Sequence, residues 1–309
     1  MGVFQGSRVW GPLLTAMVTP FNADGGVDFA EAERLANFLV DNQNNSGIVV
    51  AGTTGESPTL SDSEKLELLR VVLSAVGNKA AVVFGAGTYD TNHSSHLCKL
   101  ATDAGAHGIM LVSPYYSKPS QEGLYQHFKE VSNQTDLPVL IYNIQGRTAV
   151  NVETSTLKRL SDDVPNICAV KEASGNLAQI SEVCTTMPEG FRVYSGDDIL
   201  TLPVLSVGGI GVVSVAGHII GKDIRKLIEL FCSDGEVGSA IALNKKMIPL
   251  IQALFCTTNP TPIKYATALM GFRTSEYRLP IIPPNDAQKK QIENAMRAYG
   301  LLNTAAIAQ

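Results

Sequence analysis

The chain has 309 residues, of which 45% are hydrophobic and 17% charged, and its formal net charge is −5 (24 Lys and Arg against 29 Asp and Glu). This composition excludes a disordered, coiled-coil or fibrous chain, and the acidic balance argues against a nucleic-acid or anionic-membrane partner. The length corresponds to two domains at roughly 150 residues each, although α/β barrels often run longer as single units.

Short β-branched, apolar runs that predict strands recur along the chain. They begin near Leu13, Gly47, Ala80, Gly108, Pro138, Ile167, Phe191 and Gly211. Helix patterns lie between most of them, and Asp28, Ser61 and Ser120 are the capping residues of three. The residues expected to face the core are Leu35, Phe38 and Leu39 in the first helix, Leu66, Leu69, Leu73 and Val76 in the second, and Leu124, Phe128 and Val131 in the third.

The alternation of strands and helices predicts a parallel sheet, because parallel strands need long crossover connections. Eight strands are the number that closes a (β/α)8 TIM barrel, and an open doubly wound α/β sheet is the alternative. We expect a barrel that carries the active site over residues 1–233 and a C-terminal helical region over 234–309. Its helices are expected at Val237–Leu254, Pro262–Met270 and Ala287–Leu302.

Candidates for chemistry lie at the C-terminal ends of the strands, where barrel active sites are found. The second strand is followed by Gly52-Thr53-Thr54-Gly55-Glu56, the fourth by Ser113-Pro114-Tyr115-Tyr116 and the fifth by Tyr142-Asn143. The sixth is followed by Lys171-Glu172 and the seventh by Ser195-Gly196-Asp197-Asp198. Hydroxyl groups, a lysine and glycine-rich turns are therefore expected around one opening.

Lys171 is the most informative of these residues, because a lysine that continues a buried strand must be desolvated, paired or reactive. Burial favours the neutral amine, which attacks ketones to form a Schiff base. The alternative is that Lys171 pairs with a neighbouring glutamate or points outward. Tyr142 and Tyr116 favour the reactive interpretation, since imine chemistry needs proton carriers.

Two loops offer groups for binding anions. The Gly52–Glu56 turn has backbone amides and hydroxyls that suit a carboxylate, although its pattern taken alone favours an ordinary turn. Arg147 follows Tyr142 in a strand-to-helix loop, where it either clamps a substrate carboxylate or is a surface arginine. Asp197 and Asp198 are interpreted as solvated loop acids.

The sequence argues against cofactors. Gly85-Ala86-Gly87-Thr88-Tyr89-Asp90 has an aspartate where a dinucleotide fingerprint needs its last glycine, so no nicotinamide cofactor is expected. The histidines form no metal-binding motif. The scattered cysteines, odd in number, indicate a reduced, intracellular, metal-free protein. With no secretory signal or membrane span in the sequence, we expect a cytoplasmic location.

The strand-end motifs resemble, in order and spacing, the 4-hydroxy-tetrahydrodipicolinate synthase (dihydrodipicolinate synthase) family. This family belongs to the pyruvate-dependent class I aldolases, which also include N-acetylneuraminate lyase. The resemblance extends from about Thr15 to Leu302. The motifs that carry it are Gly-Thr-Thr-Gly-Glu-Ser at 52–57, Pro-Tyr-Tyr at 114–116, Tyr142-Asn143 with Arg147-Thr148, Lys-Glu-Ala-Ser-Gly-Asn at 171–176, Ser-Gly-Asp-Asp at 195–198, Asn-Pro-Thr-Pro-Ile-Lys at 259–264 and Arg-Leu-Pro at 278–280.

The resemblance implies a lyase that condenses pyruvate with L-aspartate 4-semialdehyde to 4-hydroxy-tetrahydrodipicolinate, on the route to diaminopimelate and lysine. Lys171 would form the imine with pyruvate, so that no metal or other cofactor is needed. Tyr142 would donate and accept protons, in a relay with Thr53 and Tyr116. Because family members receive this second tyrosine from a neighbouring subunit, a homo-oligomer is expected, usually a tetramer built from tight dimers.

The resemblance also assigns the binding residues. Thr54 would help to hold the pyruvate carboxylate, and Gly196 and Val213 would line the pocket with their backbone. Arg147 would bind the carboxylate of L-aspartate 4-semialdehyde. Sialic acid lyases share the lysine and tyrosine but lack this arginine. Another aldolase of the family that acts on a 2-oxo sugar acid is the alternative function, and a non-catalytic protein that binds pyruvate-like ligands is a third.

Two features depart from the family pattern. Gln145 stands where the family usually has proline, so the loop that carries Arg147 loses a fixed φ angle. The region that binds feedback lysine in many members has Pro58, Asp62, Lys65, Tyr89 and His93 here. Since Lys65 and His93 would not attract an ammonium group, weak or no inhibition by lysine is expected.

Overall fold

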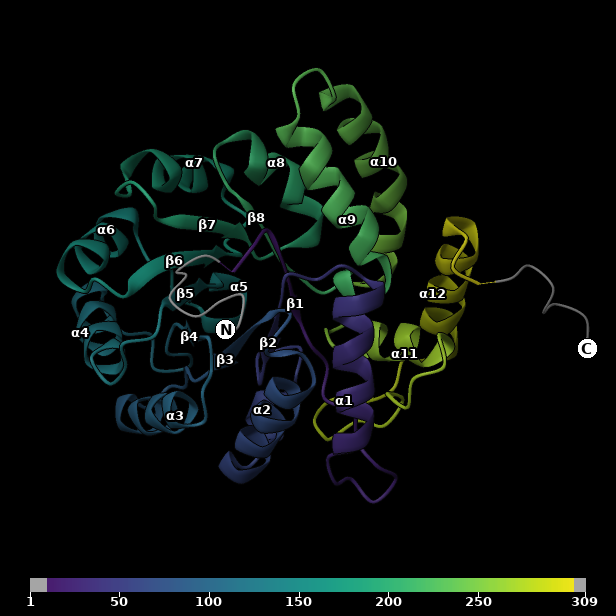
Figure 1. The fold of residues 1–309 in the computed structure, drawn as a ribbon, viewed down its shortest axis with the longest axis horizontal. Coiled ribbons are helices and arrows are strands. Elements are labelled where there is room, and N and C mark those ends of the chain that lie inside the picture. The colour runs from purple at the N-terminus through teal and green to yellow at the C-terminus, as the bar shows by residue number, and fades with distance from the viewer. Residues whose placement is uncertain (1–9, 303–309) are drawn as a thin grey trace, which may run out of the picture.

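The computed structural model describes residues 10–302, so the N-terminal residues inspected for a signal lie outside the described range (Figure 1). Within that range eight strands form a closed barrel in sequence order. Each strand begins at its predicted start or one residue after it. The strands are β1 (Leu13–Ala16), β2 (Gly47–Val50), β3 (Ala81–Gly85), β4 (Gly108–Val112), β5 (Val139–Asn143), β6 (Ile167–Glu172), β7 (Arg192–Ser195) and β8 (Gly211–Ser214).

The first and last strands close the barrel. Leu13 and Leu14 of β1 pair in parallel with Val212 and Val213 of β8. An open sheet would leave these two strands as unpaired edges. The predicted (β/α)8 barrel is therefore confirmed, and the doubly wound alternative is wrong.

Helices surround the barrel and cover the outer face of the sheet (Figure 1). Asp28, Ser61 and Ser120 each accept a hydrogen bond from the first turn of the helix they precede, which confirms the predicted starts. The helices are α1 (Phe29–Asn37), α2 (Asp62–Val76), α3 (Thr91–Asp103), α4 (Gln121–Ser132), α5 (Gln145–Thr148), α6 (Thr154–Asp163), α7 (Leu177–Thr186), α8 (Thr201–Ser206), α9 (Gly217–Cys232), α10 (Val237–Ala253), α11 (Thr261–Leu269) and α12 (Asp286–Tyr299).

The predicted core face of α2 is partly wrong. Leu69 and Val76 are buried, but Leu66 and Leu73 are only half-buried. The buried stripe runs instead through Lys65, Leu68, Leu69, Val72 and Val76. Lys65 is buried because its ammonium group lies 3.5 Å from the Asp62 carboxylate, one turn earlier on the same helix.

Two helix ends also differ from the prediction. The first helix changes at Phe38 into a π-helical turn over Phe38–Asn42, which leaves Phe38 half-buried and Leu39 buried. The last helix ends at Tyr299 rather than Leu302. Gly300 terminates it with a φ of 92°, in the left-handed region that favours glycine.

Alternation along the strands separates two apolar clusters. One lies between the sheet and the helices and includes Val50, Ile141 and Val170. The other fills the barrel interior and includes Val49, Leu140 and Val213. At the C-terminal ends of the strands, the side chains on this interior face therefore lie at the mouth of the barrel.

Strand β6 contains a β-bulge that changes this alternation. Val139 and Leu140 of β5 pair with Ile167 and Ala169 of β6, so the register shifts by one residue at Cys168. Cys168 and Ala169 consequently both belong to the interior cluster although they are consecutive. After the bulge the alternation resumes, with Val170 outside the barrel.

The helices after the barrel pack beside it. Helix α10 lies against α9, and α12 lies against both α10 and α11 (Figure 1). The expected division at residue 233 falls between α9 and α10. The division of the chain into a barrel part and a C-terminal helical part stays a prediction.

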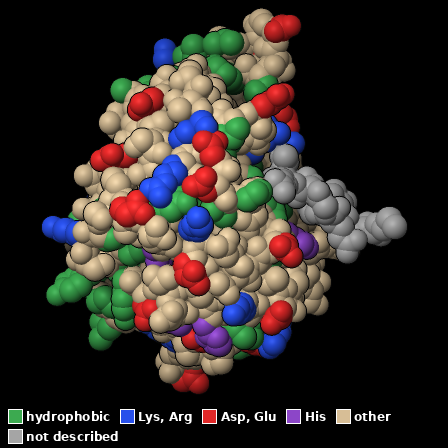
Figure 2. All heavy atoms as spheres, turned by 90° about the vertical axis from the view of Figure 1, so that its left-hand side faces the viewer, with side chains coloured by type: hydrophobic (Ala, Val, Ile, Leu, Met, Phe, Trp, Pro, Cys, Tyr) green, Lys and Arg blue, Asp and Glu red, His purple; other side chains and the backbone are tan. Residues whose placement is uncertain are grey.

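Charges are dispersed over the face formed by α3, α4, α6 and α7, where Lys and Arg side chains lie among Asp and Glu side chains (Figure 2). Such a surface differs from the single-sign patch that nucleic-acid binding needs. Among residues 10–302, none of the helices combines the length and apolar character that crossing a bilayer requires.

Candidate active site

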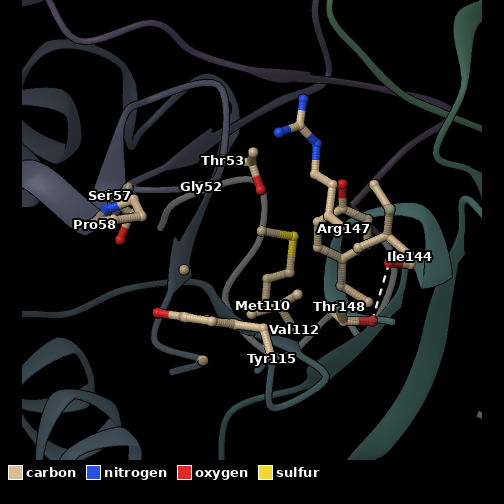
Figure 3. Close-up of a pocket in the computed structure, with 14 residues that line it drawn as sticks. Gly52, Thr53, Ser57, Pro58, Met110, Val112, Tyr115, Ile144, Arg147 and Thr148 are labelled. Carbon is tan, nitrogen blue, oxygen red and sulfur yellow. Dashed lines mark hydrogen bonds between the residues drawn. The ribbon is translucent and has the colours of Figure 1, made fainter. Parts of the chain in front are cut away.

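A cavity of about 190 Å³ opens at the C-terminal ends of β2 to β5, where the sequence places the site (Figure 3). The predicted residues Thr53, Tyr142 and Arg147 line it. In Figure 3 the guanidinium group of Arg147 and the side chain of Thr53 lie on neighbouring sides of the opening. The other lining residues are Ala51, Gly52, Ser57, Pro58, Gly85, Gly87, Met110, Val112, Tyr115, Ile144 and Thr148.

Lys171 lies next to this cavity without lining it. Its side chain is 5% exposed, and Nζ lies 3.9 Å from the centroid of the Tyr142 ring. Tyr142 and Lys171 are direct partners in the register of β5 and β6. The structure therefore brings the two predicted catalytic residues into contact and shields the Lys171 amine from bulk solvent.

Gly196 packs against the stem of Lys171. A Cβ atom at Gly196 would lie 3.1 Å from Cγ of Lys171 and 2.6 Å from Cβ of Ala173. The Gly196 N–H also donates to the carbonyl of Glu172 over 2.6 Å. A side chain at position 196 would therefore clash with Ala173 and crowd the stem of Lys171. Val213 lies in the interior cluster below, 1% exposed.

The Gly52–Glu56 turn is held from beneath by a buried ion pair. Glu56, whose φ is 56°, accepts a hydrogen bond from Lys264 Nζ over 2.6 Å, and both side chains are 1% exposed or less. Burial lowers the pKa of Lys264, although Glu56 opposes the shift. Removal of either partner would leave a buried, unpaired charge, so the pair fixes the turn that carries Thr53 and Thr54.

Asn259 joins this turn to the loop of Arg147. Its side-chain amide donates to Thr54 Oγ1 over 2.9 Å, and its backbone carbonyl accepts a hydrogen bond from Arg147 Nη2 over 3.4 Å. Thr54 is 3% exposed and does not line the cavity. Asn259 belongs to the Asn-Pro-Thr-Pro-Ile-Lys motif at 259–264, but no role was predicted for it from the sequence. Its side chain belongs to the C-terminal helical region, so the site draws on both parts of the chain.

The loop with Gln145 in place of the usual proline is a single helical turn, α5. Thr148 N–H donates to the carbonyl of Ile144 and Ala149 N–H to that of Gln145. The Thr148 hydroxyl donates to the same Ile144 carbonyl, as the dashed line in Figure 3 shows. Arg147 is therefore presented by a hydrogen-bonded turn.

The two tyrosines after β4 point in different directions. Tyr115 lines the cavity, and its ring meets that of Tyr89 edge to face, 5.4 Å between centroids. Burial, followed by the neighbouring Tyr89, raises the pKa of Tyr115. Tyr116 is 94% exposed and has a φ of 72°, which is rare for a bulky residue. The predicted site residue Tyr116 therefore does not line the cavity, whereas Tyr115, which was given no role from the sequence, forms part of its wall.

Asp198 is buried, so its interpretation as a solvated loop acid is wrong. It is 3% exposed, and its carboxylate accepts hydrogen bonds from the backbone N–H groups of Val215 and Ala216 over 2.9 and 3.2 Å and from the Ser214 hydroxyl. Burial raises the pKa of Asp198 despite these donors. Asp198 thus ties the end of β7 to the end of β8 behind Gly196.

The described residues contain no cluster of three or more His, Cys, Asp or Glu side chains arranged to hold a metal ion. The cysteines all lie within residues 10–302, and none of them forms a disulfide bond.

Comparison with known proteins shows the same family over nearly the whole chain. The model of the dihydrodipicolinate synthetase family matches residues 10–299. The chain is 48% identical over 293 residues to the 4-hydroxy-tetrahydrodipicolinate synthase of Desulforamulus reducens, covering 95% of this chain and 98% of that protein.

Two solved structures have the same fold. The DHDPS of Cyanidioschyzon merolae, crystallised with lysine bound, has a TM-score of 0.93 and 44% identity, covering 95% of this chain and 99% of that one. A variant described as the first monomeric dihydrodipicolinate synthase has a TM-score of 0.92 and 38% identity, covering 95% and 98%. The chain therefore belongs to the dihydrodipicolinate synthetase family.

Proposed function

We propose that this protein is a 4-hydroxy-tetrahydrodipicolinate synthase, which condenses pyruvate with L-aspartate 4-semialdehyde in the biosynthesis of diaminopimelate and lysine. The observation that carries the proposal is the contact of Lys171 with Tyr142 beside a cavity that Arg147 lines. Family membership and the activity named for the relative from D. reducens support it.

Lys171 supplies the covalent step. Its neutral amine attacks the ketone carbon of pyruvate, and the loss of water gives an imine that withdraws electrons from the adjacent methyl group. Loss of a methyl proton then produces an enamine, whose carbon attacks the aldehyde of the second substrate. The amino group of that substrate closes the ring on the imine carbon and releases Lys171. This sequence of steps needs no further cofactor.

Tyr142 is placed to move the protons. Its ring touches Lys171 on one side and forms part of the cavity wall on the other, so its hydroxyl serves both the departing water and the aldehyde oxygen. Thr53 lines the same cavity, and we assign to it the relay of protons between Tyr142 and Tyr116. Thr54 and the backbone near Gly196 and Val213 are assigned to pyruvate.

Tyr116 is assigned to the relay of a second subunit. Because it is 94% exposed and is not part of its own cavity, it is available to enter the site of a neighbouring copy. We therefore propose that the protein is a homo-oligomer built from dimers, usually a tetramer in this family. We also propose that it is located in the cytoplasm. In this arrangement each dimer, rather than each chain, holds complete sites.

Arg147 selects the second substrate. It offers a guanidinium group at the open side of the cavity, where a carboxylate would pair with it. The sugar acids cleaved by other aldolases of the family offer neutral hydroxyl groups in place of this second carboxylate. A single charged side chain therefore distinguishes the two substrate classes.

A coupled assay and a trapping experiment test the proposal. The purified protein is assayed with pyruvate and L-aspartate 4-semialdehyde, and in parallel for cleavage of 2-oxo sugar acids. Borohydride is then added with pyruvate, and the mass of the peptide that contains Lys171 is measured. Condensation with a reduced adduct on Lys171 is expected. Sugar-acid cleavage alone would favour the other aldolases, and the absence of an adduct would favour a non-catalytic binding protein.

A further inference from the structure

A buried hydrogen-bonded pair lies directly behind Tyr142 and Lys171. Asn143 and Glu172 are the next partners in the register of β5 and β6, and they are 0% and 1% exposed. The Asn143 side-chain amide donates to the two carboxylate oxygens of Glu172 over 3.2 and 3.3 Å. Successive strand residues point to opposite faces, so this pair lies on the helix side of the sheet.

Both members of the pair are anchored further. The Val152 N–H donates to Asn143 Oδ1 over 3.0 Å, and Asn143 Nδ2 also donates to Asn151 Oδ1 over 2.9 Å. The Ser174 hydroxyl donates to Glu172 Oε2 over 2.9 Å. Asn143 and Glu172 therefore connect the loops that follow β5 and β6, and neither side chain is free to turn.

The β-bulge at Cys168 explains why such a connection matters. Cys168 and Ala169 both face the interior, and this shift is what places Lys171 inside the barrel after Val170. If β6 slipped by one residue and lost the bulge, strict alternation from Cys168 would turn Glu172 inward and Lys171 outward. The apolar residues near the bulge would tolerate that slip better than the buried polar pair would.

We propose that Asn143 and Glu172 are positioning residues, whose hydrogen bond fixes the phase of β6 against β5 and thereby holds Lys171 beside Tyr142. The inference rests on the proposed function, because it concerns the placement of the imine-forming lysine. It assigns a task to two side chains that touch neither the cavity nor a substrate.

Single substitutions separate positioning from packing. In Asn143→Ala and Glu172→Ala we expect kcat to fall at least about tenfold, since small displacements of a reacting group are costly. The rate of borohydride-trapped adduct formation should fall in parallel, while KM for pyruvate changes less. Glu172→Gln keeps an acceptor oxygen for Asn143 and should retain kcat within about threefold.

A reversed pair provides a variant that does not depend on truncation. Asn143→Asp places two carboxylates face to face, which repel each other when both are ionised. The double variant Asn143→Asp/Glu172→Gln restores one donor and one acceptor. We expect the double variant to exceed Asn143→Asp by at least about tenfold in kcat, a coupling typical of side chains in contact. Equal activities of the two would overturn the inference.

Asn166 supplies the matched control at the other end of β6. Its side-chain amide donates to the carbonyls of Ser132 and Thr135 over 3.0 and 2.8 Å, remote from the cavity. Asn166→Ala should lower the thermal midpoint while kcat stays at the wild-type value. A similar loss of kcat in Asn166→Ala would show a general effect of strand stability and overturn the inference.

The two proposals fail in different ways. Wild-type protein that neither condenses the substrates nor forms the adduct would overturn the proposed function. Active wild-type protein with unchanged kcat in Asn143→Ala and Glu172→Ala would overturn the positioning role alone. Crystal structures of these variants give a readout besides activity, since Nζ of Lys171 should leave the Tyr142 ring. An unmoved Lys171 would also contradict the inference.

Discussion

The guanidinium group of Arg147 donates a hydrogen bond to the backbone carbonyl of Asn259, 112 positions later in the chain. This bond holds a long, exposed side chain at the cavity without neutralising its charge, since the partner is a carbonyl and not a carboxylate. The other N–H groups of the Arg147 guanidinium therefore stay available for an incoming carboxylate.

Arg147→Ala should lower kcat/KM for L-aspartate 4-semialdehyde by about 100-fold, the effect of losing a charge-assisted hydrogen bond to a substrate carboxylate. The amount of pyruvate trapped on Lys171 should stay unchanged, because the imine forms before the second substrate binds. Arg159→Ala is the control. Arg159 pairs with Glu122 on the outer surface, and its loss should leave both measurements as in the wild type.

Tyr142→Phe should keep the ring against Lys171 but remove the proton carrier. We expect kcat to fall by between about 100- and 10,000-fold, the range for loss of a general acid–base group. The pyruvate adduct should still form, more slowly, as measured by borohydride trapping followed by mass spectrometry. Wild-type kcat in this variant would assign the proton transfers to another residue.

Tyr116 gives a prediction about subunits. If it enters the neighbouring site, Lys171→Ala and Tyr116→Phe should each be inactive or strongly impaired alone. Unfolding and refolding the two variants together in equal amounts should then recover roughly a quarter of the wild-type activity, because half the dimers are mixed and each mixed dimer has one complete site. Absence of recovery would mean that Tyr116 acts within its own chain or has no role.

Binding of free L-lysine should be weak. The carboxylate of Asp62 already lies 2.8 Å from His93 Nε2 and 3.5 Å from Lys65 Nζ, so an added ammonium group meets a satisfied anion and a like charge. Isothermal titration calorimetry should give a Kd weaker than about 1 mM, which corresponds to a binding free energy smaller than about 4 kcal/mol. As a control, titration with pyruvate shows that the same protein sample binds a substrate. Saturable lysine binding at micromolar concentration would refute the prediction.

His218 should make the stability fall below neutral pH. It is completely buried. Its Nε2 accepts a hydrogen bond from the Val18 N–H over 3.1 Å, and its Nδ1 lies 2.8 Å from the carbonyl oxygen of Val215. Burial lowers its pKa to about 4, from an ordinary value of 6.5. The unfolded chain therefore binds a proton between these values that the folded chain does not. The stability contributed by neutral His218 is complete above pH 6.5 and declines as the pH falls toward 4.

Between about pH 7 and pH 5 this histidine should reduce the free energy of unfolding by about 2 kcal/mol. Urea unfolding of the wild type and of His218→Gln at the two pH values isolates the effect, because the other titrating groups are common to both. The difference between the pH values should be smaller in the variant. An equal difference would show that His218 takes up its proton in the folded state as readily as in the unfolded chain.

The strands were predictable because a closed parallel sheet is covered on both faces and leaves continuous apolar runs in the sequence. Lys171 stood out for the same reason, as a charge in such a run. The face of α2 was harder to predict, since Lys65 was not among the residues expected to face the core, although an ion pair allows it to be buried. A local pattern does not reveal such pairing.

The site was only partly predictable. Tyr142 followed from its place at the end of β5, Arg147 from its place after that strand, and the turn of Thr53 from its place after β2. Asn259 did not, because its contacts with Thr54 and Arg147 join segments more than a hundred residues apart. The β-bulge at Cys168 could not be predicted from the sequence either, because it is defined only by the pairing of β6 with β5.

The contributions of Asn259 and Lys264 bear on any attempt to move this chemistry to another scaffold. A polypeptide shortened to end after α9 would keep the residues assigned to catalysis, yet Glu56 would lose its buried counter-ion and Thr54 its donor. A transplanted barrel would therefore require the trailing helices as well, and changes in that trailing segment offer a route to altered substrate preference that spares the strands themselves.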